Sequence, residues 1–529
     1  MDPDPPTRAG LDAAGARRSR ACATVLYLAV AAIAVGTFAR TVTYPFVYDD
    51  RHVIEQNPVV TAPGGWAKAL ASPFWPPERS IDPLYRPVTT LSFKINHAID
   101  ASGAIGCRAV NLALHAVTAV LAAAFARRLW GRGSAAWVAG VLFATHPIHT
   151  EALGLVVGRG ELLVGALVTW MLVRHLGREA ACANPSAWYH LTTSVLFLLA
   201  LGSKEHAVVA WPAIMLIDLW HRRRSGDRGS RRAFVRRVLG SHHLGLMFAL
   251  ATFLFMRWVV FGARTALPAD LVNRFANPLL GESMSVRTAT PFALLWLVMR
   301  QWFIAAPLCP IWSVGGFDPP ATFFRGDALA GVGIVLVMLV VAFLAWRRRE
   351  RCWLPVALFA LAVLLPCHFV PAANWLYAER WIYLPSVFLA AAIGGLAVWV
   401  PRFSVAGSAA AAALLLATSV PYSRCWASHE GLFDAVVQRQ PYSYHGLVGL
   451  AVVRHKTGRL AESPVYVERL TGRFPGSERA WYYRILVARA LEDWGAAARA
   501  LQRWGALRPP GPPPAGIARI AEEVRARGH

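Results

Sequence analysis

The segment Ala328–Trp346 reads ALAGVGIVLVMLVVAFLAW, and Arg347, Arg348 and Arg349 follow it directly. It carries no charged residue, and its length is close to the ~20 apolar residues that an α-helix needs to cross a bilayer. A helix satisfies all of its backbone polar groups internally, as the bilayer requires. Basic residues at one end are typical of a cytoplasmic flank. The segment therefore predicts a transmembrane helix whose C-terminal end faces the cytoplasm.

The composition indicates many such helices. Of the 529 residues, 56% are hydrophobic and 16% are charged, whereas a soluble domain carries roughly 25% charge. This excludes a soluble multidomain protein, a disordered chain and a small disulfide-rich module. The predicted fold class is all-α, a polytopic membrane protein of about 11 transmembrane helices. The ten further apolar runs are Ala23–Phe38, Val110–Ala126, Ala135–Thr145, Leu162–Val173, Tyr189–Gly202, Ala207–Trp220, Leu244–Phe261, Trp353–Phe369, Trp381–Val400 and Val405–Val420.

The N-terminal run could also be a signal peptide, because Arg17, Arg18 and Arg20 precede it. We expect an uncleaved span, since Val35–Phe38 is a poor cleavage site and many spans follow. The expected domains are a cytoplasmic tail (1–22), a transmembrane domain (23–420) with large outer loops at 41–108 and 262–327, and a C-terminal helical domain (421–529) on the outer side.

The net charge of +24 could suggest nucleic acid as a partner. The basic residues are better explained as loop charges that fix membrane orientation, so no nucleic acid is expected. With the N-terminus in the cytoplasm, the short basic connections all fall on the cytoplasmic side. This holds only if Pro291–Trp312, which contains Arg300, is re-entrant or interfacial. The connections concerned are Arg127–Arg132, Arg174–Arg178, Arg222–Arg237, Arg347–Arg349 and Arg402.

The chain becomes amphipathic and arginine-rich after Val420. Small and aromatic residues recur between Gly446 and Ala480 at close to the ~34-residue period of tetratricopeptide repeats. Two or three degenerate repeats fit this segment. An array this short is marginal alone, so we expect it to dock on the membrane domain.

Asp49 and Asp50 lie just beyond the first span, in the string FVYDD. They could simply begin a solvated loop or cap a helix. Alternatively, they form a general base or a metal site that faces a lipid-borne substrate. Partial desolvation would raise the basicity of such a carboxylate, as general-base work near neutral pH requires.

Later in the same loop, Pro87 is suited to begin a helix, with Arg86 near its N-terminus and Lys94 two turns along. This element could offer cations and backbone N–H groups to a phosphate. It could equally be an amphipathic helix that lies on lipid headgroups.

His146, His149 and Glu151 end the third span, and Arg159 opens the fourth. Zinc is disfavoured, because histidines three residues apart with a proline between them are not a HExxH pair. Hydrogen bonding to a sugar phosphate, or packing at the outer mouth of the helices, fits these residues better.

Lys204 and Glu205 interrupt an otherwise apolar stretch, where charge is costly unless it is paired or faces a cavity. Lys204 could bind a phosphate, or Lys204 and Glu205 could form a structural pair. Glu379 and Arg380 place another ion pair at a span entrance. All of these charged motifs fall on the less basic, outer side. Their convergence on one side is stronger evidence for a functional site than any single motif.

In this order, the motifs resemble the transmembrane-and-TPR-containing (TMTC) family of GT-C-fold glycosyltransferases over roughly Phe46–Pro441. The matching strings are FVYDD at Phe46–Asp50, YRPVT at Tyr85–Thr89, HPIHTEA at His146–Ala152, GR at Gly158–Arg159, ELL at Glu161–Leu163, SKE at Ser203–Glu205, AER at Ala378–Arg380 and YLPS at Tyr383–Ser386.

The resemblance implies transfer of mannose from a dolichyl or other polyprenyl phosphate to Ser or Thr hydroxyls of a protein acceptor, with inversion. It implies that Asp49 and Asp50 are catalytic, and that no metal or cofactor is needed beyond the lipid-linked donor. The residues expected to bind the donor are Arg86, Lys94, His146, His149, Glu151, Arg159, Lys204, Glu205, Glu379 and Arg380. The repeat segment would engage the protein acceptor, in the endoplasmic reticulum membrane of a eukaryote or the plasma membrane of a bacterium.

Three alternatives stay open at this point. The first is a GT-C transferase that uses another polyprenyl-linked sugar, with a glycan or lipid as acceptor. The second is a transporter, although transporters place ionisable residues near the mid-membrane, often in inverted repeats, and this chain shows no such duplication. The third is a non-catalytic membrane anchor that presents the C-terminal repeats to partners.

Overall fold

The computed structural model describes residues 8–76, 83–100, 103–178, 186–225, 242–262, 277–279, 282–370, 375–508 and 511–527. These residues form helices and connecting segments, with no β-strand among them. The predicted all-helical class is therefore confirmed. Most of the predicted basic cluster Arg222–Arg237, and part of the outer loop 262–327, lie outside the described residues.

Each of the eleven predicted apolar runs contains a helix. Six helical segments are long and apolar enough to cross a bilayer, namely those at 20–43, 104–130, 156–176, 243–261, 326–347 and 404–427. The others are shorter, so the count of about 11 crossings stays a prediction. The helices of this membrane body are α1 (Arg8–Phe38), α5 (Ala104–Trp130), α6 (Gly133–Thr145), α8 (Arg159–Leu176), α9 (Ala187–Ser203), α10 (Ala210–Ser225), α12 (His242–Phe261), α13 (Met284–Ile304), α14 (Gly326–Arg347), α15 (Trp353–Val363), α16 (Tyr383–Leu396) and α17 (Pro401–Ser423).

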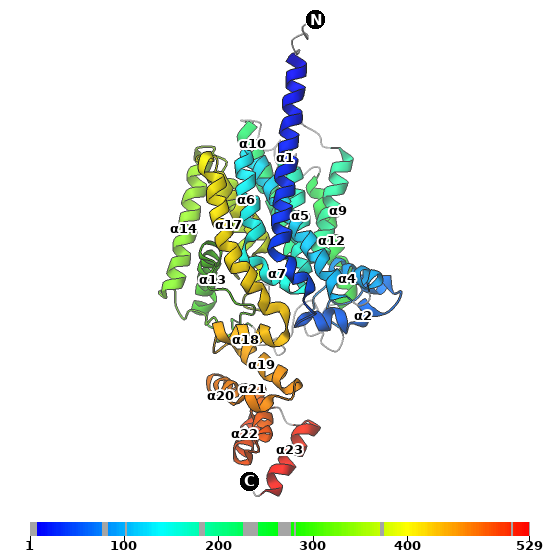
Figure 1. The fold of residues 1–529 in the computed structure, drawn as a ribbon, viewed down its shortest axis with the longest axis vertical. Helices are drawn as coiled ribbons and strands as arrows, with labels where there is room; N and C mark the ends of the chain where they lie inside the picture. Colours follow the sequence, from blue (N-terminus) through cyan, green and yellow to red (C-terminus); the bar gives the residue numbers. More distant parts are fainter. Residues whose placement is uncertain are drawn as a thin grey trace.

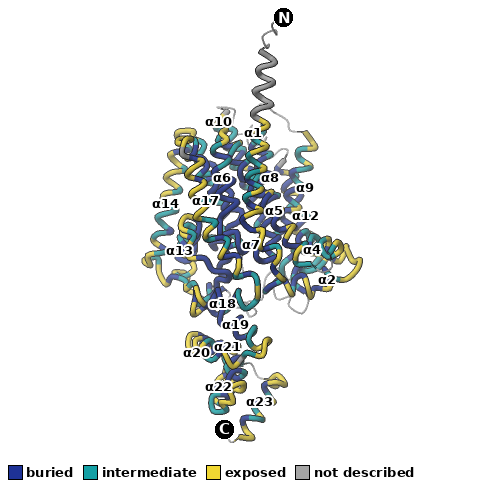
Figure 2. Tube along the Cα trace, in the orientation of Figure 1, coloured by how far each residue is buried: buried dark blue, intermediate teal, exposed yellow. Residues whose placement is uncertain are grey.

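Close helix packing builds the centre of this body. An added Cβ at Gly140 of α6 would lie 2.8 Å from Val30 of α1 and 3.0 Å from Ala123 of α5. Small residues allow helices in a bilayer to approach this closely. Figure 2 shows α5, α6 and α8 largely buried, with exposed residues along α14 and α17. The apolar outer faces of α14 and α17 therefore fit contact with lipid.

The basic connections meet at one end of the bundle, as the topology predicted. Arg351, just before α15, donates to the carbonyl of Leu129 at the end of α5 (2.9 Å). Arg223 of α10 donates to the carbonyl of Trp346 in α14 (2.6 Å). We call this the basic end, and the opposite end, which carries the C-terminal helices, the outer end (Figure 1).

Short elements cover the outer end, between the long helices. They follow α1, or join α6 to α8, α9 to α10 and α15 to α16. These elements are η1 (Ala39–Thr43), η2 (Arg51–Glu55), α2 (Pro58–Thr61), α3 (Trp66–Leu70), α4 (Pro87–Ile99), η4 (Pro147–His149), α7 (Thr150–Gly154), η5 (Val156–Gly158), η6 (Glu205–Val209) and η8 (Glu379–Ile382).

The predicted re-entrant segment Pro291–Trp312 divides into two parts. Its first part is helical and continues α13 to Ile304, with Pro291 inside the helix. Helix α13 packs along α14. Its second part is a non-helical segment in which Cys309 and Trp312 donate to Glu379 of η8. Helix α13 is not among the six helices that are long and apolar enough to cross a bilayer, and its re-entrant or interfacial placement stays a prediction.

The C-terminal segment is a chain of helices in which each packs against the next. Helix α19 begins at Tyr444 and α21 at Glu478, so their starts are separated by close to the ~34-residue tetratricopeptide period. The first helices of this tail share the main hydrophobic core, whereas α21 to α23 have a second core around Trp504 and Ile520. The tail helices are η9 (Arg424–Ala427), α18 (His429–Arg439), α19 (Tyr444–Lys456), η10 (Leu460–Glu462), α20 (Pro464–Arg473), α21 (Glu478–Ala490), α22 (Trp494–Leu507) and α23 (Ala515–Ala526).

Candidate active site at the outer end

The two neighbouring aspartates beyond α1 have different surroundings. The Asp50 side chain is fully buried, and its carboxylate accepts hydrogen bonds from the backbone N–H of Val47 (3.3 Å) and of Val157 (2.9 Å). The Arg108 guanidinium lies 3.7 Å away. Burial raises the pKa of Asp50 to about 6, although Arg108 and the backbone N–H groups act against this rise. Asp50 therefore ties the first outer loop to η5 and α5.

Asp49 instead lines a small pocket at the outer end, with Tyr48, Glu151 and Arg380. Its side chain is half-buried. Tyr48 adopts a left-handed backbone conformation (φ 53°), which turns the chain sharply just before the aspartate pair. Aromatic and apolar residues form most of the remaining wall, namely Leu155, Pro310, Ile311, Trp312, Trp375, Tyr377, Ala378 and Trp426.

Arg380 pairs with Glu151 inside this pocket. The guanidinium of Arg380 contacts the carboxylate of Glu151, whose other oxygen accepts from the Arg380 backbone N–H (2.9 Å). Burial raises the pKa of Glu151, and the charge of Arg380 opposes that rise. Asp49 is also close enough to Arg380 to interact with it electrostatically. One cation therefore links the half-buried Asp49 to the buried carboxylate of Glu151.

Lys204 and Glu205 do not pair with each other, contrary to one reading of the sequence. Lys204 contacts Glu161 of α8, and Arg86 binds Glu205 (3.0 Å). The reason is local geometry: Lys204 is extended (φ −162°, ψ 143°) between α9 and η6, so successive side chains point in opposite directions. His206 lies 3.2 Å from the second carboxylate oxygen of Glu161.

Arg86, Lys204 and Arg380 form what we call the outer cation cluster. Burial lowers the pKa of Lys204 to about 8; Glu161 opposes this shift, while the nearby charges of Arg86 and Arg380 add to it. The three side chains are 14%, 12% and 23% exposed, so solvent and ligands can reach all of them. Arg86 precedes Pro87, which begins α4 as predicted. Three cations so close together can stabilise a phosphate that carries two negative charges.

Two other predicted phosphate ligands are occupied by protein groups. Lys94 is only 3% exposed, and its ammonium donates to the carbonyls of Val59 (3.2 Å) and Ala62 (2.8 Å). Arg159 is completely buried and stacks over Phe93. Its guanidinium donates to Asn111, Ser92, Asn96 and the carbonyl of Cys107.

Arg108, which the sequence analysis did not single out, resembles these two residues. Its guanidinium is fully buried and donates to the carbonyls of Tyr44, Pro45, Leu153 and Gly154. We call Lys94, Arg108 and Arg159 the buried cation group. Their donors are used to fix the outer loops against α4, α5 and α7.

The two histidines of the HPIH string serve packing. His146 donates from Nε2 to the carbonyl of Trp302 (2.8 Å) and stacks on its indole ring. His149 donates from Nδ1 to the carbonyl of Phe143 (3.0 Å). Burial lowers the pKa of His146 to about 4 and lowers that of His149 as well, so both are neutral. Within the described residues, no group of three His, Cys, Asp or Glu side chains could hold a metal.

Glu379 joins three separate segments behind the pocket. It is fully buried, and burial raises its pKa to about 8. One carboxylate oxygen accepts from Gln301 (3.1 Å), the Cys309 backbone (2.7 Å) and the Trp312 indole (3.2 Å), and the other accepts from the Tyr422 hydroxyl (2.8 Å). Glu379 thus positions Arg380 and the Trp312 wall and does not itself line the pocket.

The tail also contributes to this site. The His429 ring at the start of α18 accepts a hydrogen bond from the Tyr48 backbone N–H (3.1 Å), and Phe433 packs edge-on against the Tyr48 ring (5.9 Å). Ser443 bonds to Ser313 (2.8 Å) in the segment that forms another wall. The predicted docking of the tail on the membrane domain is therefore observed, and it occurs next to the candidate base.

Curated proteins with similar sequences are protein O-mannosyl-transferases by name. The Caenorhabditis elegans protein F38B6.6 is 27% identical over 64% of this chain and 46% of its own length. Human TMTC1 is 27% identical over 77% of this chain and 50% of its own length, and human TMTC4 is 28% identical over 68% and 53%. The chain spans about half the length of these relatives.

No protein-family profile and no solved structure matches the chain. The similarity to human TMTC1 and human TMTC4 nevertheless extends over 77% and 68% of the chain. The resemblance that these motifs predicted is confirmed at the level of sequence: the chain is similar to several TMTC proteins.

Proposed function

We propose that this protein is a membrane mannosyltransferase, which moves mannose from a polyprenyl phosphate, such as dolichyl phosphate, to a Ser or Thr hydroxyl of a protein acceptor. The observation that carries the proposal is that Asp49 and Arg380 line one pocket, with Lys204 close enough to interact electrostatically with both Arg380 and Arg86. The names of the relatives support the reaction class, and the six apolar helices fit a substrate held in a membrane.

Asp49, rather than Asp50, is the proposed general base. A base must reach the proton that it removes, and Asp49 lines the pocket whereas Asp50 is buried under the loop. The acceptor hydroxyl attacks the anomeric carbon of mannose, and its proton passes to the Asp49 carboxylate. The bond between that carbon and the phosphate oxygen breaks. Attack opposite the phosphate inverts the configuration.

The outer cation cluster is the proposed partner of the leaving group. The donor phosphate is a diester with one negative charge, and it leaves as a monoester with a second charge. Cations aimed at the position where charge develops lower the barrier more than they stabilise the bound donor. Arg380 lines the pocket, and Lys204 and Arg86 lie behind it within electrostatic reach of one another, whereas the donors of the buried cation group are already used.

The orientation of the site follows from the charge pattern. The basic connections lie at one end of the bundle and the pocket at the other, and basic loops are cytoplasmic in most membrane proteins. We therefore propose that transfer occurs on the non-cytoplasmic side, which is the lumen in a eukaryote or the periplasm in a bacterium. Acceptor engagement through the tail is part of the same proposal.

A transfer assay with matched aspartate variants tests the proposal. The purified chain is supplied with polyprenyl phosphate mannose and Ser- or Thr-containing peptides, and mannosylated product is quantified. We expect Asp49→Asn to lower kcat by about 10²–10⁴-fold, the usual contribution of a positioned general base, with unchanged thermal stability.

Asp50→Asn is the control in the same assay, because its carboxylate is buried and structural. We expect this variant to unfold at lower temperature but to retain transfer at temperatures where it is folded. Full activity of Asp49→Asn would refute the assignment of the base. Absence of product from the wild-type chain with every polyprenyl-linked sugar would refute the transferase proposal itself.

A further inference from the structure

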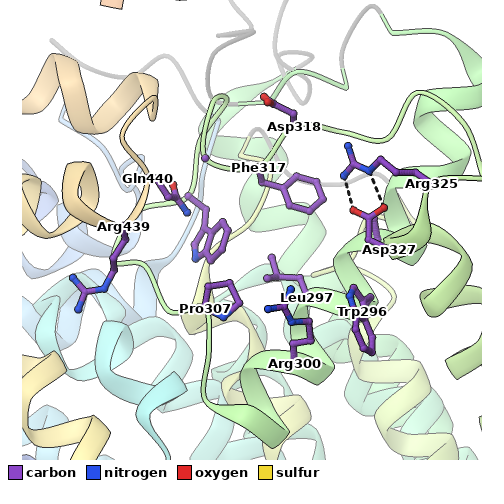
Figure 3. Close-up of a pocket in the computed structure, with 13 residues that line it drawn as sticks. Trp296, Leu297, Arg300, Pro307, Phe317, Asp318, Arg325, Asp327, Arg439 and Gln440 are labelled. Carbon is purple, nitrogen blue, oxygen red and sulfur yellow. Dashed lines mark hydrogen bonds and ion pairs between the residues drawn. The ribbon is translucent and has the colours of Figure 1, made fainter. Parts of the chain in front are cut away.

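A second and larger cavity lies on the other side of Trp312 from the Asp49 pocket. It encloses about 360 Å³ between α13, the start of α14 and the end of α18. Figure 3 shows Trp296, Leu297 and Arg300 of α13 along one side, with Phe317 and Gln440 facing them. The cavity combines aromatic rings, arginines and an amide, and nothing in the proposed transfer reaction uses it.

The charges around this cavity are not balanced. Arg325 forms a bidentate ion pair with Asp327, and Asp318 pairs with Arg473 (2.9 Å), so both lining carboxylates are neutralised. Arg300 is exposed and has no carboxylate partner in the described part of the chain. The cavity therefore has an excess of positive charge at Arg300, which favours an anion.

The side-chain oxygen of Gln440 is an acceptor that needs a hydrogen-bond donor. The residue is 7% exposed, and its Oε1 is buried without a hydrogen-bond partner. A buried polar atom left unpaired costs roughly 1–3 kcal/mol, so a ligand hydroxyl there would be favourable. The end of α18 thus offers an acceptor to the same space to which Arg300 offers a positive charge.

The position of the cavity identifies the source of the anion. Arg325 and Asp327 flank the first residue of α14, Gly326, which begins a candidate membrane span. Close by, Phe303, Ile304 and Phe324 are 58%, 66% and 85% exposed. Apolar side chains this exposed at a helix end, together with tryptophan, are typical of the membrane interface. The cavity therefore opens at the depth of lipid headgroups.

We propose that this cavity binds the headgroup of an anionic membrane lipid that carries both a phosphodiester and a free hydroxyl. Arg300 bonds to the phosphate, the headgroup hydroxyl donates to Gln440 Oε1, and Trp296 and Phe317 pack against its carbon atoms. Because α18 also contacts the Asp49 loop through its first residues, a lipid here would hold the tail against the membrane body.

Lipid retention by the full chain tests the proposal independently of transfer activity. The purified protein is exchanged into phosphatidylcholine or phosphatidylglycerol, and retained lipids are counted by native mass spectrometry. We expect one tightly retained phosphatidylglycerol molecule, bound about tenfold more weakly by Arg300→Gln, which loses one charge-assisted hydrogen bond. Arg300→Lys should restore part of the affinity.

Two controls separate the alternatives. Arg348→Gln removes an exposed arginine at the basic end of α14 and should leave retention unchanged. Soluble glycerol phosphate should not displace the lipid at equal concentration. Phosphatidylethanol, an anionic phosphodiester that lacks the headgroup hydroxyl, should bind more weakly than phosphatidylglycerol. Equal retention by Arg300→Gln and wild type would overturn the proposal. Full displacement by glycerol phosphate would also overturn it, in favour of a soluble anion.

Discussion

The outer cation cluster and the buried cation group consist of the same residue types within one end of the molecule, yet they are suited to different tasks. The side chains of Arg108 and Arg159 are fully buried. Their guanidinium groups donate mostly to backbone carbonyls and to side-chain amide oxygens. The members of the outer cation cluster pair with carboxylates and stay partly exposed, and the pair of Arg380 and Glu151 lines the Asp49 pocket. The partners and the exposure of a cation, and not its residue type, therefore separate a structural role from a ligand-binding role.

Loss of a member of the buried cation group should act mainly on the stability of the protein. Replacing Arg108 by Met leaves Asp50 without its cation and leaves the carbonyls of Tyr44, Pro45 and Gly154 unpaired. Removing one partner of a buried pair typically costs about 3–5 kcal/mol. Thermal unfolding in detergent should show the loss, while Arg348→Gln, an exposed change, should stay within about 0.5 kcal/mol. An unchanged unfolding temperature for Arg108→Met would contradict the structural role assigned to the buried cation group.

The next effect should appear in catalysis. Arg86→Gln removes one member of the outer cation cluster, whose partner Glu205 stays 33% exposed and can be hydrated. Loss of one group that stabilises developing charge costs about 10²-fold in kcat, whereas stability should change by less than about 1 kcal/mol. Steady-state kinetics and unfolding curves of the same preparation check both halves. A stability loss without a kinetic loss would place Arg86 in the structural class.

A smaller effect is expected from pH. Because the pKa of Lys204 is lowered to about 8, its ammonium form is fully present near pH 7 and is lost as the pH rises through 8. Donor use, measured as kcat/KM, should therefore fall about fivefold between pH 8 and 9. Lys204→Arg should abolish this alkaline limb, since Arg stays charged. If the alkaline fall in kcat/KM persists in Lys204→Arg, another titrating group must cause it, and the assignment to Lys204 would be wrong.

The same shift has an opposite consequence for folding. In the unfolded chain Lys204 keeps its ordinary pKa, so the unfolded state binds more protons than the native state between about pH 8 and 10.5. The contribution of this residue to the unfolding free energy consequently rises with pH in that window. As the pH rises, kcat/KM should therefore fall while the contribution of Lys204 to the unfolding free energy increases. This opposite trend distinguishes loss of the ammonium charge from general alkaline unfolding.

The smallest effect concerns the tail. His429→Ala removes the acceptor of the Tyr48 N–H and should lower kcat about threefold, because a net hydrogen bond of about 1 kcal/mol helps to position Asp49. His429→Gln should restore most of the rate, and KM for the donor should hardly change. His455→Ala, an exposed change in α19, is the matched control. Equal kcat for His429→Ala and wild type would show that the tail does not position the base.

Much of the fold could be predicted from the sequence, because long apolar runs specify helices locally. Every predicted run contains a helix, and the prediction that Pro87 begins α4 is confirmed. The gathering of the charged motifs at one end also followed, since basic connections define the other end. These inferences need only hydropathy, charge and chain order.

The partners of the charged residues could not be predicted in the same way. Lys204 and Glu205 are neighbours, but an extended residue between two helices directs them to Glu161 and Arg86. Asp49 and Asp50 are adjacent, but the left-handed Tyr48 precedes a turn after which only Asp49 reaches the pocket. Arg108 was missed because a single arginine near the start of an apolar run looks like a loop charge. Such details depend on tertiary packing, which periodicity does not encode.

The close fit of α18 and α19 to the pocket wall determines where this chain can be divided for study. A truncation at the end of α17 would remove His429 and Ser443 and expose the core around Leu432 and Leu447. Helix α20 and one face of α21 belong to the main core, whereas α22, α23 and the other face of α21 form a second core. Fluorescent proteins, affinity handles or additional repeats should therefore be joined beyond α21 rather than directly after α19. The smallest useful expression unit should therefore retain the first tail helices together with the membrane body.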